Sequence, residues 1–136
     1  MIHTPVCDLL GITHPIVLGG MASGTSVPLV AAVSNAGGLG TLGVTGLSAA
    51  QIRDQIAAIR AATDKPFGVN FLLFLTEEAN FNAALEARPP VVSFAWARPE
   101  QDLRHYFHVY TRLDYSSCIW LVRCLRQYGR LKLGLT

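Results

Sequence analysis

Short apolar runs alternate with amphipathic segments along the first 97 residues. Each run is bounded by glycine, proline or polar residues, which is typical of strands that are buried on both faces. The runs predict strands at residues 15–18, 38–43, 67–73 and 91–94.

The segment between the second and third of these runs has the clearest helical spacing. Ser48 and Gln51 match a capping box, in which each side chain satisfies a backbone N–H of the other residue. Ile52, Ile56 and Ile59 then recur at helical spacing, so one face is apolar and packs on a core.

Two further helices are predicted from their end signals. Ser26 is a good N-cap for the first, and Gly37 ends it. Thr76 is expected to cap the other, which Pro89 terminates. Strands and helices alternating in this way predict an α/β fold with parallel strands and right-handed crossovers. Spacing leaves open a doubly wound sheet or a (β/α)8 barrel. A barrel needs about 250 residues, so this chain would supply its N-terminal half.

The pattern changes near residue 97. Residues 1–97 carry a net charge of −2, whereas residues 98–136 carry +4 and hold all four tyrosines. Residues 119–122 fit a strand or a helix, and an apolar-basic helix over 118–126 fits equally well. We therefore expect βα units over 1–97 and an atypical basic, aromatic tail over 98–136. The tail lacks any recognised nucleic-acid module, so no nucleic-acid partner is expected.

Composition narrows the class of protein. Charged residues make up 15% of the chain and hydrophobic residues 51%. The charged fraction is low for a free-standing domain, which suggests that some of its surface is normally covered by other protein. The three cysteines have no metal or redox spacing, and a reduced, cytoplasmic chain is expected. No signal peptide is recognised. The uncharged run at residues 9–52 is interrupted by glycines and prolines, so no membrane span is expected.

The stretch Pro15–Gly46 is central because it holds eight of the twelve glycines and no charged residue. It is interpreted as strand, loop, helix, turn and strand. Gly19, Gly20 and Met21 then lie at the carboxyl end of a strand, where parallel α/β folds bind ligands. Glycines let a ligand approach the backbone, and methionine offers a polarizable contact for a ring. From the residues alone, a tight turn with Met21 in the core is the favoured alternative.

Asn70 is the second candidate, because an amide within an apolar strand must find hydrogen-bond partners. It could bind a ligand or only neighbouring backbone.

The glycines at 37–40 follow a helix rather than a strand, which excludes the dinucleotide fingerprint. The four histidines, His3, His14, His105 and His108, show no metal spacing, and no catalytic constellation emerges. No catalytic or metal-binding residue is assigned.

Three segments resemble nitronate monooxygenases, and together they span about residues 8–97. These are FMN-dependent (β/α)8-barrel enzymes, and flavin-dependent enoyl-ACP reductases and IMP dehydrogenases share parts of the motifs. The resemblance implies that Gly19, Gly20 and Met21 lie against the flavin ring and that Asn70 binds FMN. The segments are LGITHPIVLGGMASGTSVPLVAAVSNAGGLGTLG, LSAAQIRDQIAAIRAATDKPFGVNFLL and PPVVSFAW.

The resemblance implies oxidation of alkyl nitronates by O2. Leu18 and Gly20 replace the glutamine and proline often seen in the family, and Ala95 stands where many relatives carry histidine. Residues 98–136 resemble none of the later βα units, which carry the catalytic histidine and the phosphate loops. A truncated or frame-shifted product of reduced activity is therefore expected, and the flanking DNA would test this. The alternatives are an enoyl-ACP reductase-like enzyme and a non-enzymatic half-barrel that self-associates through open sheet edges.

Overall fold

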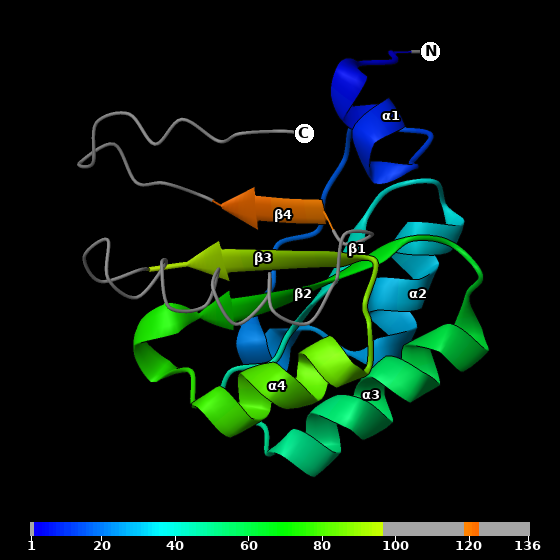
Figure 1. Cartoon of the computed structure of the whole chain (residues 1–136). Helices are drawn as coiled ribbons and strands as arrows, with labels where there is room; N and C mark the ends of the chain where they lie inside the picture. Colours follow the sequence, from blue (N-terminus) through cyan, green and yellow to red (C-terminus); the bar gives the residue numbers. More distant parts are fainter. Residues whose placement is uncertain (1, 97–118, 123–136) are drawn as a thin grey trace, which may run out of the picture.

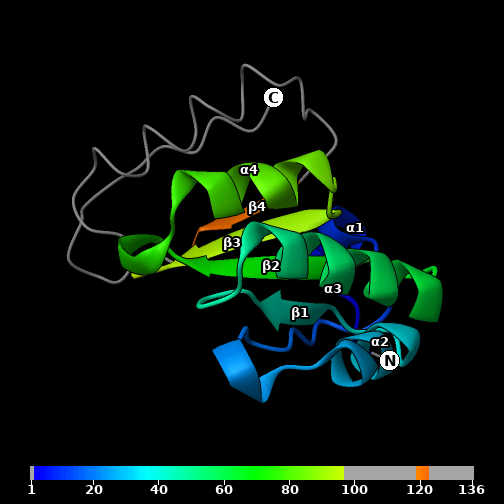
Figure 2. The same cartoon turned by 90° about the horizontal axis from the view of Figure 1, so that it is seen from below.

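The computed structural model describes residues 2–96 and the backbone of residues 119–122. Four parallel strands form one sheet in the order β1-β2-β3-β4, with their carboxyl ends along one edge (Figure 1). Helices α2, α3 and α4 pack on one face of the sheet (Figure 2). The predicted parallel α/β class is confirmed. The elements are α1 (Pro5–Leu10), the 3-10 turn η1 (Ala22–Gly24), α2 (Val27–Asn35), β1 (Gly40–Gly43), α3 (Ala49–Ala62), β2 (Phe67–Leu72), the 3-10 turn η2 (Leu73–Leu75), α4 (Glu78–Glu86), β3 (Val91–Ala95) and β4 (Ile119–Val122).

The main core lies between the sheet and these helices. Phe71, Phe81 and Phe94 meet with ring centroids 5.5–6.2 Å apart, which ties α4 to β2 and β3. All three isoleucines of the predicted stripe on α3 are fully buried, as the helical spacing indicates. The capping box is present too: Gln51 N–H donates to Ser48 Oγ (3.4 Å), and Ser48 N–H donates to Gln51 Oε1 (2.9 Å).

A second, smaller core closes the amino ends of the strands. It joins α1 to the starts of β1 and β3, and its members are Cys7, Leu10, Ile12, Leu39 and Val91. The α1 segment itself is helical from Pro5 to Leu10, and two of its residues face this core. Gly11 ends α1 in the left-handed conformation (φ 67°), which glycine adopts without steric cost.

The first predicted strand is reduced to one bridge. Val17 pairs with Leu39 in parallel, through Leu39 N–H to Ile16 O and Leu18 N–H to Leu39 O, both 2.9 Å. The path is that of a strand, but the segment starts at a proline and turns away at Gly19, so no longer ladder forms.

Two details at helix starts differ from expectation. The N-cap of α4 is Glu77 rather than Thr76, because the Thr76 hydroxyl donates to Leu72 O (2.9 Å) and closes η2. Ser26 is the N-cap of α2, although its side chain makes no capping hydrogen bond.

Residues 119–122 form a strand that pairs in parallel with β3, which decides between the strand and helix interpretations of that segment. The rest of the expected tail, 98–118 and 123–136, lies outside the described residues.

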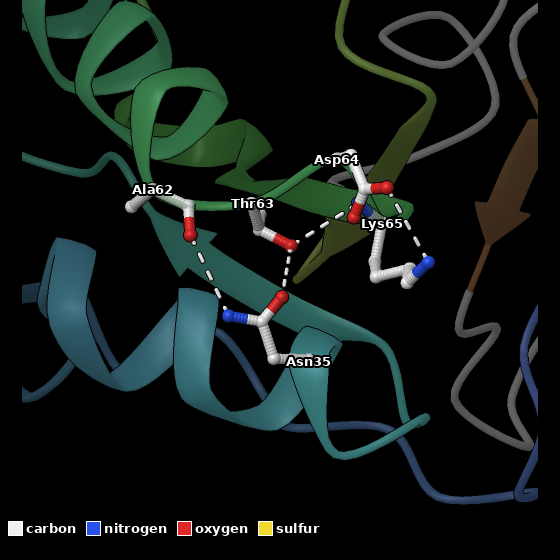
Figure 3. Close-up of polar contacts among 5 residues, drawn as sticks. All are labelled: Asn35, Ala62, Thr63, Asp64 and Lys65. Carbon is white, nitrogen blue, oxygen red and sulfur yellow. Dashed lines mark hydrogen bonds and ion pairs between the residues drawn. The ribbon is translucent and has the colours of Figure 1, made fainter.

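A polar network connects the ends of α2 and α3 at the side of the sheet where the strands begin, called here the amino side (Figure 3). Asn35, at the end of α2, accepts from Thr63 Oγ1 (2.6 Å) and donates to Ala62 O (3.5 Å), so it joins α2 to the end of α3. Thr63 Oγ1 also accepts from Lys65 N–H (3.1 Å). A hollow of about 80 Å³ adjoins this network. Its floor is made of loop residues that support the sheet, on the side opposite the predicted ligand edge.

Candidate functional site

The candidate site begins with one row of residues at the carboxyl edge of the sheet. Gly43, Asn70 and Ser93 are Cα partners on β1, β2 and β3. Alternation along the strands directs this row away from the face that carries α2, α3 and α4. The row is therefore on the face of the sheet opposite these helices, near the carboxyl ends of the strands.

Two glycines bring the Gly20–Ala22 segment onto this row. A Cβ at Gly20 would lie 2.5 Å from Asn70 Cβ and 3.0 Å from Asn70 Oδ1. A Cβ at Gly43 would lie 2.4 Å from Ala22 N. Neither position has room for a side chain, so the backbone of this loop is in direct contact with this face of the sheet.

Thr25 anchors the Gly20–Ala22 loop to the end of β1. Its hydroxyl donates to Ala22 O (3.1 Å) and accepts from Gly43 N–H (2.9 Å). The residue is buried, so both hydrogen bonds are shielded from water. The loop is consequently held at two points, by contact with Asn70 and by hydrogen bonds to the end of β1.

Asn70 is half-buried, and its Nδ2 donates to Ser93 Oγ (3.0 Å). This bond satisfies part of the amide with a neighbouring side chain rather than with backbone. Oδ1 of Asn70 makes no hydrogen bond within the described residues, so it is available as an acceptor.

Met21 is 54% exposed, so the alternative that placed it in the core is wrong. Two further apolar side chains stand at the same edge: Phe74 follows β2 and Trp96 follows β3, with their ring centroids 6.5 Å apart. Both are exposed, and Trp96 has a left-handed backbone (φ 58°), which is rare for a bulky residue. The edge thus combines polar groups with an apolar rim.

The lysine and arginine residues of the described chain lie away from this edge. Arg53 pairs with Glu86 (2.9 Å), Arg60 donates to Arg88 O, and Lys65 belongs to the amino-side network. The two described histidines are also on the amino side: His3 contacts Asp8, and His14 packs beside Gly37. His105 and His108 lie outside the described residues.

Over residues 2–96 and 119–122, no three His, Cys, Asp or Glu side chains are grouped as a metal ion would require. None of the helices described there is both long enough and apolar enough to cross a membrane.

The structure therefore brings Gly20, Met21 and Asn70 together, with Gly19 exposed beside them. A Cβ at Gly19 would meet nothing within 4 Å, so its neighbourhood is open. Ser93 and the Phe74–Trp96 pair were not expected from the sequence. Ser93 is a polar residue in an apolar strand, as Asn70 is, and that shared signal could have indicated it. The arrangement places hydrogen-bonding groups and exposed apolar side chains side by side at this edge.

Comparisons with known proteins indicate the family. The sequence profile of the family described as nitronate monooxygenase matches residues 3–118. A nitronate monooxygenase of Paraburkholderia phytofirmans is 47% identical over 78 residues, which cover 57% of this chain and 21% of that protein. A carboxyl-CoA dehydrogenase of Mycobacterium tuberculosis, acting on a hydroxy-methyl-oxo-octahydroindene, is 44% identical over 69 residues, covering 51% and 19%.

Solved structures give the same fold. FabK from Thermotoga maritima aligns with a TM-score of 0.74 and 34% identity, covering 90% of this chain and 37% of that one. Nitroalkane oxidase from Streptomyces ansochromogenes aligns with a TM-score of 0.67 and 29% identity, covering 88% and 42%. This chain spans about a fifth of the curated relatives and about two fifths of these structures. The predicted half of a barrel with parallel strands is confirmed.

Proposed function

The chain belongs to the nitronate monooxygenase family, a family of oxidoreductases, and on that premise we propose that its carboxyl edge is the ring-binding wall of an FMN site. The reaction proposed for the whole protein is oxidation of alkyl nitronates with O2. The observation that carries the proposal is the packing of the Gly20 backbone against Asn70, with Met21 exposed beside it.

The residues present fit a flavin ring. The packing of Gly20 on Asn70 and of Gly43 on Ala22 holds the loop in place. A Cβ at Gly19 would meet nothing within 4 Å and Met21 is 54% exposed, so a ring can approach the backbone of the loop there. Met21 would contact the face of the ring, and Asn70 would hold its polar edge. When bound, FMN supplies the redox chemistry between the nitronate and O2. The protein's part is to orient the ring and to limit its exposure to water.

The described residues offer few groups that could bind the phosphate of FMN. None of the four described basic residues, Arg53, Arg60, Lys65 and Arg88, lies at the carboxyl edge, whereas Glu77 and Glu78 start α4 there. A phosphate dianion needs positive charge or helix N–H groups. We therefore propose that this chain binds FMN weakly and has reduced or no activity alone.

Titration of the purified chain with FMN, followed by flavin fluorescence, tests this proposal. We expect saturable quenching with a weak dissociation constant, further weakened in Asn70→Ala. Stoichiometric tight binding would overturn the prediction of weak binding, and the absence of any binding would overturn the site itself. The matched control is Asn82→Ala, an amide on α4 away from the carboxyl edge, which should bind FMN as the wild type does.

A second candidate is a flavin-dependent reductase of enoyl thioesters. The observation in its favour is the similarity to a carboxyl-CoA dehydrogenase, whose name identifies its substrate as a CoA thioester. An NADH oxidation assay with an enoyl thioester, run on the full-length parent protein, separates the two. Nitronate-dependent O2 uptake without NADH oxidation supports the first candidate, and the converse supports the second.

A third candidate is a half-barrel that self-associates without catalysis. It is favoured by the exposed sheet edge at Val17, whose own N–H and C=O make no hydrogen bond within the described residues. Open edges with apolar side chains recruit other strands. Light scattering after size exclusion would show a defined dimer if this candidate is correct.

A further inference from the structure

Asn70 and Ser93 lie next to each other on neighbouring strands and face the same side of the sheet. The third member of their row is Gly43, and the backbone of Ala22 occupies the space where a Cβ of Gly43 would stand. Gly20 closes another flank, because its backbone lies against Cβ, Cγ and Oδ1 of Asn70. The amide therefore has little freedom to change its rotamer.

The hydrogen bond between the two side chains determines what they present. Asn70 Nδ2 donates to Ser93 Oγ at 3.0 Å, so the amide N–H is directed at serine. A hydroxyl that accepts a bond still has a proton to donate. Within the described residues, neither Asn70 Oδ1 nor the Ser93 O–H makes a further hydrogen bond. The pair thus offers the Oδ1 acceptor beside the serine O–H donor, with the second N–H of Nδ2 as a further donor.

We propose that Asn70 and Ser93 act as one unit that recognises an imide edge, meaning an N–H with an adjacent C=O on a planar ring. The ring N–H would donate to Asn70 Oδ1, and the neighbouring carbonyl would accept from Ser93 Oγ. Ser93 is then a positioning and specificity residue, since it orients the amide and also contacts the ligand. This inference rests on the proposed flavin site, because the flavin ring carries such an edge.

The opposite amide orientation exchanges the two roles. If Oδ1 of Asn70 accepted from the Ser93 hydroxyl, Nδ2 would donate to the ring carbonyl and Ser93 Oγ would accept from the ring N–H. Both orientations need the ring N–H, so methylation of the ring nitrogen tests recognition of the imide edge in either case.

The test uses the full chain and two phosphate-free probes, lumiflavin and its N3-methyl derivative. Fluorescence titration is performed on the wild type, Ser93→Ala, Ser93→Thr and the control Ser26→Ala, whose hydroxyl makes no capping bond. Wild type should bind lumiflavin about tenfold more tightly than the methylated probe. Ser93→Ala should weaken lumiflavin binding about fivefold and reduce the preference, whereas Ser93→Thr should restore both.

Each outcome is decisive. A wild-type preference near unity, or a preference unchanged in Ser93→Ala, overturns the inference and leaves the flavin site standing. Absence of lumiflavin and FMN binding to the wild type overturns the proposed function and the inference together. The preference of the wild type needs no variant, so it decides the question even if Ser93→Ala does not fold. A general loss of stability would weaken both probes equally and would leave their ratio unchanged.

Discussion

Gly20 lies so close to Asn70 that a Cβ at residue 20 would stand 2.5 Å from Asn70 Cβ. Real Cβ contacts of this kind do not occur, so the loop and β2 are fitted to each other through the absence of a side chain. The adjacent Gly19 has open space around it, which provides a matched comparison within the same loop.

Gly20→Ala is expected to lower the free energy of unfolding by about 1–3 kcal/mol, because the added methyl group overpacks against Asn70. Gly19→Ala should change it by less than about 0.5 kcal/mol, as surface substitutions usually do. Thermal unfolding followed by circular dichroism measures both. Equal losses in the two variants would contradict the contact.

Ser34→Ala is expected to cost about 2–3 kcal/mol, since the Ser34 hydroxyl bridges two elements. It donates to Pro66 O (2.8 Å) and accepts from Gly40 N–H (3.1 Å), and the residue is 1% exposed. Its loss leaves two buried backbone groups unpaired. Urea denaturation is the measurement, with the exposed Ser26→Ala as control. A loss no larger than that of Ser26→Ala would show that water replaces the hydroxyl.

Met21→Ala should leave the unfolding free energy within about 0.5 kcal/mol of wild type, because the side chain is 54% exposed. If the proposed flavin site is correct, the same change weakens FMN binding severalfold. Met21→Leu should retain most of the affinity, because it keeps an apolar contact of similar size. Unchanged FMN binding in Met21→Ala would remove Met21 from the site.

Ile16→Lys should reduce self-association, since Ile16 is 62% exposed beside the open edge at Val17 and charged residues protect sheet edges. Light scattering over a range of protein concentrations measures the effect. Leu29→Lys makes the same change on α2, at a residue that is 38% exposed. If both variants reduce association equally, general solubility rather than the edge is responsible.

The exposed pair Arg53–Glu86 should contribute less than about 1 kcal/mol, despite its 2.9 Å separation, because both side chains are about half in solvent. A double-mutant cycle with Arg53→Ala and Glu86→Ala, repeated at high salt, gives the coupling energy. A coupling above this value that resists salt would indicate that the pair is shielded from water.

Sequence reasoning succeeded where the signal was local. The isoleucine spacing of α3 and the Ser48–Gln51 box depend on residues within a few positions of one another, so the helix and its buried face were predictable. The parallel class followed from the order of strands and helices. These features do not require knowledge of which distant residues meet.

The misses are non-local. Ser93 is 23 residues from Asn70, and their contact depends on the register between β2 and β3. The length of the strand near Val17 depends on how its partner is placed, not on its own apolar residues. Met21 was favoured for the core because methionine is usually buried, and only the folded loop reveals its exposure.

The small core at the amino ends of the strands can be completed only after most of the described chain has been synthesised. Cys7 and Leu10 are covered together with Val91, more than 80 residues later in the chain. At about 5–20 residues per second, the ribosome needs several seconds to reach that residue. During this interval α1 has no completed surface to dock on. The Cys7 thiol, which is 1% exposed in the finished fold, is therefore open to chemical attack on the nascent chain and is covered once Val91 is in place.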